Sequence, residues 1–169
     1  MNQARSLEQK NQFKLTGNVS LYELPADYTY EDFKRLSNKE KYLVDRGDNL
    51  AVTIGLQQVI LLMIGSNTNS FTHCGVGSGT NTPAAGDLDL QTAIGRNTVN
   101  DRYRVGLSGY WNTFFGKSDQ NGTWNETCLA TASSGNNILC RRKFDAAFTK
   151  DTSKSSVISW VITLAAVAD

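Results

Sequence analysis

The sequence is poor in the residue types on which most enzyme chemistry depends. Its 169 residues include one histidine, His73, three cysteines and two prolines. Any Ser-His-Asp or Cys-His mechanism would therefore have to use His73. Three cysteines are an odd number, which argues against an obligate disulfide framework. A chain of this length is normally one domain and buries roughly two-thirds of the surface that its unfolded form exposes, so it needs no such framework.

Net charge and long apolar runs are lacking as well. The 17 basic and 16 acidic residues leave a net charge of +1, so no long-range field draws the chain to DNA or to anionic lipid. The N-terminus has no apolar core of the signal-peptide kind. The main apolar runs, residues 59–64 and 157–168, are too short or too interrupted to span a membrane. We expect a soluble protein, made in a cytoplasm, with no nucleic-acid or membrane partner.

The polar N-terminus is expected to serve assembly. Residues 1–16 are rich in Gln, Asn, Lys and Glu and show no periodicity, and a segment of this composition does not fold alone. Such an arm becomes ordered when it lies against a neighbouring chain. We therefore predict an extended assembly arm over residues 1–16, a single domain over residues 17–169, and a homo-oligomer.

The domain is predicted to be mainly β. Strands are expected at residues 18–24, 50–54, 103–107 (half-buried) and 157–168, and a hairpin at residues 123–130 and 137–144. A short helix is expected within residues 29–44, and a buried helix at residues 56–64 that ends at Gly65. These strands, with their glycine-rich connections and an embedded helix, indicate a β-sandwich, of which the jelly roll is one form.

Two details of the predicted core concern Trp160 and the cysteines. Trp160 stands in an alternating apolar pattern and is expected on a central, buried strand. Cys128 and Cys140 each lie six residues from Ser134, so a hairpin centred there places them opposite each other. They are expected either to form a disulfide or to pack as two small apolar side chains on one face. Cys74, the odd residue, is expected to be a buried thiol.

No group of residues indicates catalysis. His73 and Cys74 are adjacent, so in a strand they point to opposite faces and do not bind one metal. Ser78 lacks the Gly-x-Ser-x-Gly spacing of a nucleophile elbow. The glycines of residues 75–79 are not followed by a helix that would hold a phosphate, and residues 116–118 (Gly-Lys-Ser) lack the first glycine of a Walker A motif. We predict no catalytic residue, no cofactor-binding residue and no metal ligand.

Two further groups of residues have alternative interpretations. The basic run of residues 141–143 is interpreted as a solvated or interface-facing end of a strand, in preference to a nucleic-acid site. Five aromatic residues could line a sugar-binding platform, although their spacing favours the core and a subunit interface. These are Tyr110, Trp111, Phe114, Phe115 and Trp124.

The most informative segment is residues 71–96. In it a short apolar strand is followed by Gly75, Gly77 and Gly79, then by a Thr-Asn-Thr-Pro turn and an Asp-Leu repeat. Glycine permits close backbone contacts, and Pro83 fixes its own φ angle. We interpret the segment as a connection between two sheets and not as an active site.

This segment resembles a motif of tailed-bacteriophage virion proteins. The motif reads Thr-His, then Gly-x-Gly-Thr-x-x-Pro, then an Asp and Leu pattern that ends in Ile-x-Arg. The resemblance extends over residues 48–164, with further matches at residues 48–57, 125–129, 138–144 and 159–164. The family usually continues Glu-Ala-Gly-Leu-Phe where this chain has Glu-Thr-Cys-Leu-Ala at residues 126–130.

The resemblance implies a structural protein of the virion, with no enzyme activity, whose partners are other virion proteins. The expected role is a capsid decoration, or cement, protein that binds the outer capsid and stabilises it. A neck, collar, whisker or tail-fibre-attachment component is an alternative, and a host-glycan-binding receptor module is an alternative from another class. The family commonly has histidine at the position of His73, which implies a structural hydrogen bond to backbone.

Overall fold

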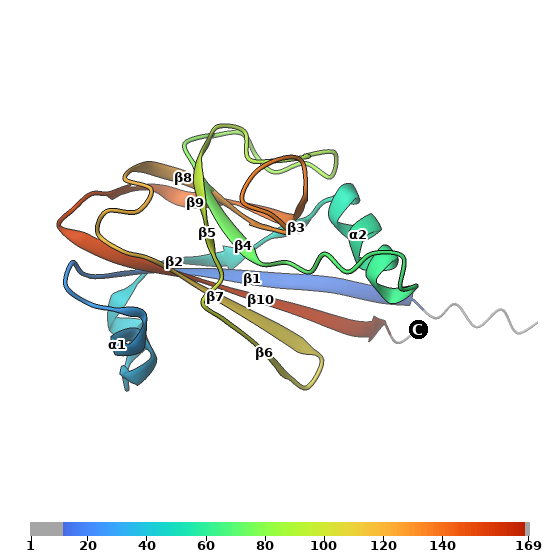
Figure 1. Ribbon diagram of the computed structural model, residues 1–169, viewed down its shortest axis with the longest axis horizontal. Helices are drawn as coiled ribbons and strands as arrows, with labels where there is room; N and C mark the ends of the chain where they lie inside the picture. Colours follow the sequence, from blue (N-terminus) through green and yellow to red (C-terminus); the bar gives the residue numbers. More distant parts are fainter. Residues whose placement is uncertain (1–11, 168–169) are drawn as a thin grey trace, which may run out of the picture.

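The computed structural model describes residues 12–167 and consists of two antiparallel five-stranded sheets that face each other (Figure 1). Sheet A contains, in spatial order, β2 (Leu43–Asp48), β1 (Gln12–Pro25), β10 (Lys154–Val167), β7 (Ser108–Phe115) and β6 (Asp101–Val105). Sheet B contains β3 (Leu50–Ala51), β9 (Ile138–Lys150), β8 (Gly122–Ala130), β4 (His73–Gly77) and β5 (Ala93–Thr98). The predicted β-sandwich is confirmed. Its described residues form ten strands, where a jelly roll has eight.

The centre of sheet A is β10, which lies between β1 and β7. Its residues Ile158, Trp160 and Ile162 are buried in the core between the two sheets, as their alternation predicted. Across that core the indole Nε1 of Trp160 donates a hydrogen bond to the Sγ atom of Cys74, at 3.3 Å. The largest side chain of β10 therefore connects sheet A to sheet B.

The first strand begins earlier than predicted. Residues 12–16, which the sequence analysis assigned to the arm, pair with β10, from Gln12 opposite Val167 to Thr16 opposite Thr163. Strand pairing uses backbone N–H and C=O groups, so a polar composition does not exclude it. The predicted boundary between arm and domain is therefore wrong for residues 12–16. The rest of the predicted arm, residues 1–11, lies outside the described residues.

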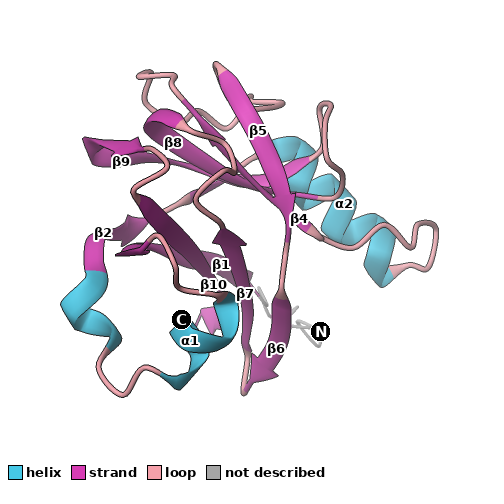
Figure 2. Cartoon of the chain, turned by 60° about the vertical axis from the view of Figure 1, so that its left-hand side comes forward, coloured by secondary structure: helices cyan, strands magenta, loops and turns pink. Residues whose placement is uncertain are grey.

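The helix expected within residues 29–44 is shorter than predicted. Thr29 caps helix α1 (Tyr30–Arg35) through a capping box. The helix lies beside sheet A (Figure 2), and its Phe33 packs with Tyr22 and Val157 on the outer face of that sheet. A 3₁₀ helix, η1 (Lys39–Tyr42), follows. Leu43, which falls within the range given for the predicted helix, is the first residue of β2.

Helix α2 (Thr53–Met63) contains most of the helix predicted at residues 56–64. It is followed by Gly65 with a φ of 71°, the left-handed conformation expected there. Gly55 was expected to separate a strand from the helix, but it lies inside α2, and a Cβ atom at this position would come within 2.4 Å of the Leu139 backbone. Glycine therefore lets α2 approach β9 closely. No helix within residues 12–167 has the length and apolar character needed to cross a membrane.

The predicted hairpin of β8 and β9 is present, but its register differs where the cysteines lie. Next to the turn, Ala130 pairs with Ile138, as a hairpin centred on Ser134 requires. The ladder then shifts by one residue, so that Leu129 pairs with Cys140. Cys128 and Cys140 therefore point to opposite faces of sheet B, and both forms of the predicted pairing are wrong. All three cysteines are free and buried, as expected for Cys74.

The glycine-rich segment does not connect the two sheets. β4 and β5, which flank it, are neighbours in sheet B, and Leu90 of the intervening loop packs with Cys128 on the outer face of that sheet. Gly75 and Gly77 belong to β4 itself. A Cβ atom at Gly75 would come within 2.9 Å of both Arg96 and Cys128. Glycine therefore leaves room for these two side chains and for the loop between β4 and β5. The residues between β4 and β5 are called the cover loop below (residues 78–92).

Candidate interaction surface

The cover loop is held by a buried carboxylate, which sequence analysis did not identify. Glu126 on β8 is fully buried and accepts hydrogen bonds from the backbone N–H groups of Gly79, Gln91 and Thr92, at 2.9–3.1 Å. It also accepts one from the Arg141 Nε atom on β9, at 2.6 Å. One side chain thus fixes both ends of the loop. The only signal that could have identified Glu126 is its position opposite Gly77 of the glycine-rich strand β4. That position is known only when the register of the two strands is known.

The Asp-Leu repeat of the cover loop places its two acids on two different arginines. Asp87 pairs with Arg141, whose Nη2 atom also donates to the Asn81 carbonyl at 3.0 Å. Asp89 pairs with Arg96, which donates further hydrogen bonds to the turn between β8 and β9. The segment that carries the resemblance is therefore a structural clasp, in which two acids of the loop are held by two arginines.

The interpretation of the basic run as a solvated or interface-facing strand end is wrong for its two arginines. Arg141 lies in the clasp, and Arg142 is buried and pairs with Asp45 of β2, which connects the edge of sheet A to sheet B. Only Lys143 is exposed. The two guanidinium groups are buried because each has carboxylate and carbonyl partners, which the sequence pattern does not reveal.

The His73 side chain is linked through Thr72 to the backbone just after the neighbouring strand β8. Its Nδ1 atom lies 2.9 Å from the Thr72 hydroxyl, which itself donates to the Thr131 carbonyl at 3.0 Å. The hydroxyl therefore accepts from His73, so the expected hydrogen bond to backbone is instead a bond to a side chain. Partial burial lowers the pKa of His73, and the charge of Arg96 lowers it further.

The five aromatic residues do not form one platform. Phe115 and Trp124 pack edge-on against each other in the core. The indole of Trp111 donates to the Phe71 carbonyl at 3.1 Å, and Phe114 lies with Phe33 on the outer face of sheet A. Tyr110 stacks on Tyr103 of the neighbouring strand β6, with the two rings parallel and their centroids 4.7 Å apart.

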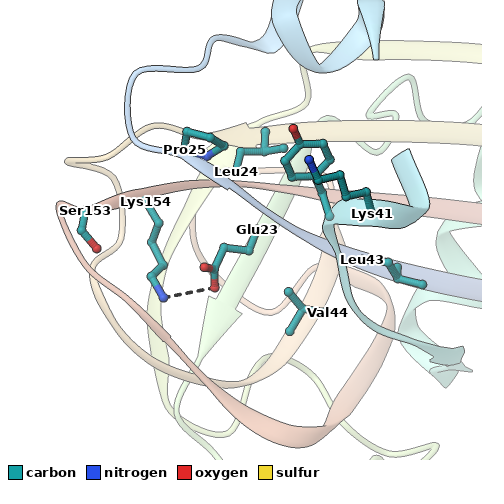
Figure 3. Close-up of a pocket in the computed structure, with 9 residues that line it drawn as sticks. Glu23, Leu24, Pro25, Lys41, Leu43, Val44, Ser153 and Lys154 are labelled. Atoms are coloured by element: carbon teal, nitrogen blue, oxygen red, sulfur yellow. Dashed lines mark hydrogen bonds and ion pairs between the residues drawn. The ribbon is translucent and has the colours of Figure 1, made fainter. Parts of the chain in front are cut away.

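A wide cleft of about 610 Å³ lies where β1 ends and β2 begins (Figure 3). Its polar groups include the ion pair of Glu23 with Lys154, at 3.1 Å. Pairs of this kind at the surface contribute about 0–1 kcal/mol. Its lining comprises Glu23, Leu24, Pro25, Lys41, Tyr42, Leu43, Val44, Ser153 and Lys154. The charged groups of this cleft already have partners or lie over aromatic rings, so it has no marked ligand chemistry.

Helix α2 is exposed, in contrast to the predicted buried helix. Only Val59 and Leu62 pack against the main core, while Met63 is 74% exposed. The outward side chains form a helix stripe, which consists of Leu56, Ile60, Met63 and Ile64. An all-apolar helix is usually buried on every side. Here sheet B covers one side only, and the stripe stays exposed among residues 12–167.

The hairpin of β6 and β7 exposes a second apolar group. The strand predicted at residues 103–107 was expected to be half-buried, and this expectation is wrong. β6 is the edge strand of sheet A, and the tip of the hairpin carries Leu107, which is 69% exposed. We call this group the hairpin surface. It consists of Tyr103 and Val105 on the outer face of sheet A, Leu107 at the tip and, from the end of β10, Leu164 on the inner face.

A groove of about 750 Å³ connects α2 to the hairpin surface. Its lining includes Leu62 of α2, Leu107, Leu164, Tyr110 and Trp111, and two arginines, Arg102 and Arg104. In Figure 1 the helix, the end of β10 and the tip of the hairpin lie at the same end of the molecule. Contiguous exposed apolar surface of a few hundred Å² marks sites where proteins bind one another. The apolar end is therefore the candidate functional site.

Comparisons with known proteins do not place the chain in a family. No family model matches it, and no curated protein or solved structure matches it either. The resemblance to tailed-phage virion proteins therefore depends on the sequence motifs alone.

Proposed function

We propose that the chain is a non-enzymatic structural protein of a tailed-phage virion, most simply a capsid decoration protein that binds the outer capsid and stabilises it. The observation that carries the proposal is the exposed apolar surface at one end of the domain. The cover loop, in contrast, is held by buried ion pairs. The motif resemblance supports the phage context. The partners would be other virion proteins, and the location would be the particle.

The proposed mechanism is adhesion through burial of apolar surface. Full burial of one Leu or Val side chain contributes about 1.5–3 kcal/mol. Leu107 and Leu164 are exposed and line the same groove, so a complementary patch on the capsid would gain more than one such contribution. Each copy would be held at several points, so that one formed contact raises the effective concentration of the others.

A neck or tail component is the alternative within this class, and copy number distinguishes the two. Quantitative gel electrophoresis of purified virions should show hundreds of copies for a decoration protein and about a dozen for a neck or tail protein. Absence of the chain from purified virions would refute both versions.

The contribution of the hairpin surface can be tested on particles that lack the chain. Purified wild-type protein should sediment with such particles, and Leu107→Lys should reduce the bound fraction at least tenfold. Leu88→Lys is the control, because Leu88 is an exposed leucine of the cover loop and does not line the groove between α2 and the hairpin. Equal binding of the two variants would contradict the proposed contact surface.

A host-glycan-binding module remains the second candidate, and one surface favours it. On the outer face of sheet A a polar row crosses the strands, in which Arg46 donates to Ser20 and Ser159 donates to Asn112. This row lines a groove of about 340 Å³ next to Tyr110. Polar groups beside aromatic rings suit sugar binding. Glycan-array binding that Asn112→Ala abolishes would support this candidate over adhesion.

A further inference from the structure

We infer that the helix stripe of α2 is the contact surface for α2 of a second copy of this chain. The two helices pack antiparallel about a twofold axis that passes next to Ile60. This inference deepens the proposed assembly role, and it rests on that role for the biological use of the contact. The hairpin surface is left for the particle.

The spacing of the stripe fits helix-to-helix packing. Leu56, Ile60 and Met63 follow one another at four and three residues, which is the spacing of the apolar seam in paired helices. In a twofold pair, a residue i that contacts residue j of the other copy is matched by a contact of j with i, and only a residue on the axis meets its own symmetry partner. Ile60 lies in the middle of the seam, so it meets Ile60 of the second copy, while Leu56 meets Met63 at either end.

The charge pattern favours an identical partner over a charged one. No Asp, Glu, Lys or Arg occurs between residues 49 and 86, the segment that contains α2 and the turn after it. Two copies of this face therefore meet without like-charge repulsion, which costs several kcal/mol when it occurs at an interface. A charged partner, in contrast, would find no opposite charge on this helix.

The weak capping of α2 also favours a partner on its exposed side. Its N-cap residue, Val52, makes no side-chain cap, and the helix has no acidic residue in its first turn and no basic residue in its last. Exposed helices of this length gain much of their stability from caps and packing. Covering the open side of α2 would supply packing that sheet B supplies on one side only.

The available area fits a reversible dimer. The four residues of the stripe expose roughly 500 Å² of mostly apolar surface per copy, and neighbouring residues such as Leu61 extend it towards the roughly 800 Å² per partner of a standard interface. An interface at this lower limit is expected to dissociate in the micromolar range. The dimer should therefore depend on protein concentration.

The first test is the mass of the purified full-length chain in solution. Sedimentation or light scattering should show the mass doubling as concentration rises from a few to a few hundred micromolar. Ile60→Lys and Ile60→Glu should each remain monomeric, while Leu88→Lys dimerises like wild type. A mixture of the two Ile60 variants should regain a dimer, because opposite charges then meet at the axis. That recovery also shows that both variants are folded.

The second test locates the axis. All three native cysteines are fully buried, so Ile60→Cys introduces the one exposed thiol among the described residues. Mild oxidation should link two copies of Ile60→Cys, but not two copies of the control Leu88→Cys. Failure to crosslink would exclude the proposed axis. A wild-type chain that stays monomeric, or an Ile60→Lys variant that still dimerises, would overturn the inference.

The two proposals fail in distinguishable ways. A chain that dimerises through α2 but is absent from virions would refute the virion role and leave the contact intact. A chain that is present in virions but monomeric in solution would refute the contact and leave the role intact.

Discussion

The Nε atom of Arg141 lies 2.6 Å from the Oε2 atom of Glu126, and both side chains are almost completely buried. They stand on neighbouring strands of sheet B, beneath the cover loop. A buried charge is tolerated only when it is paired and hydrogen-bonded. Here the pair is completed by Asp87 and by three backbone N–H groups of the loop. The loop and the ion pair therefore depend on each other.

Removal of Glu126 should release the cover loop. Glu126→Ala leaves the Arg141 charge with one carboxylate fewer and three N–H groups without their acceptor, so the free energy of unfolding should fall by about 3–5 kcal/mol. Glu126→Gln, which keeps one acceptor oxygen, should lose less. Urea unfolding measures the difference, and limited proteolysis should cut within residues 78–92 of the alanine variant. An alanine variant with unchanged stability would contradict the clasp.

Gly55→Ala should destabilise the protein although alanine favours helices. The added Cβ atom would lie 2.4 Å from the Leu139 backbone, so α2 would have to move away from β9. Overpacking of this kind costs about 1–3 kcal/mol. Gly86→Ala is the control, since no atom lies within 4 Å of its added Cβ atom. Thermal unfolding should show a lower Tm for Gly55→Ala alone; equal Tm values would mean that α2 does not approach β9 closely.

Stability should fall as the pH drops below about 6.5, in part because of His73. Its pKa is lower in the folded chain than the ordinary value, so the unfolded chain binds the proton more tightly. The contribution is present above the unfolded pKa and is lost as the pH falls towards the folded one. His73→Gln should weaken this dependence between about pH 7 and pH 5. Urea midpoints of both proteins at several pH values provide the measurement, and parallel profiles would argue against the prediction.

The cysteines should be unreactive in the native chain. Burial raises the pKa of Cys74 to about 11 and also raises the pKa values of Cys128 and Cys140, and the thiolate is the reactive form. Iodoacetamide at about pH 8 should leave the folded protein unmodified and label three sites after unfolding. Rapid labelling of the folded chain, or a disulfide between Cys128 and Cys140 in peptide maps, would show that the register of sheet B is different.

Several features were predictable because they depend on neighbours in sequence. Trp160 stands in an alternating strand pattern, and alternation directly determines which face a side chain occupies. The turn around Ser134 was also visible, since turn residues act locally, and the pairing of Ala130 with Ile138 follows from it. The predicted pairing of Cys128 with Cys140 is wrong because the strand ladder shifts by one residue just beyond the pair of Ala130 and Ile138. This shift depends on how α2 and β3 pack against β9 near Leu139, which local sequence does not reveal.

The clasp was partly predictable. The motif of residues 71–96 indicated a loop flanked by strands, which is present, but the prediction that it connects two sheets is wrong because β4 and β5 are neighbours in sheet B. Its anchors were not identified, because Glu126 and Arg141 are distant in sequence and become neighbours only through strand pairing. For the same reason the basic run was interpreted as solvated, although Arg142 finds Asp45 almost one hundred residues away.

By itself, the sequence determined that the chain forms a β-sandwich and that residues 56–64 form an apolar helix, because periodicity and composition control both. It did not show that the helix begins at Thr53, within the strand predicted at residues 50–54. Tertiary structure alone decided which side of that helix is covered. Gly55 and Leu62 meet the sandwich, whereas Ile60 and Met63 meet nothing in the described chain. The physical reason is that an apolar run favours burial on all sides equally, and only the placement of β9 and of the core selects the side that is left for a partner.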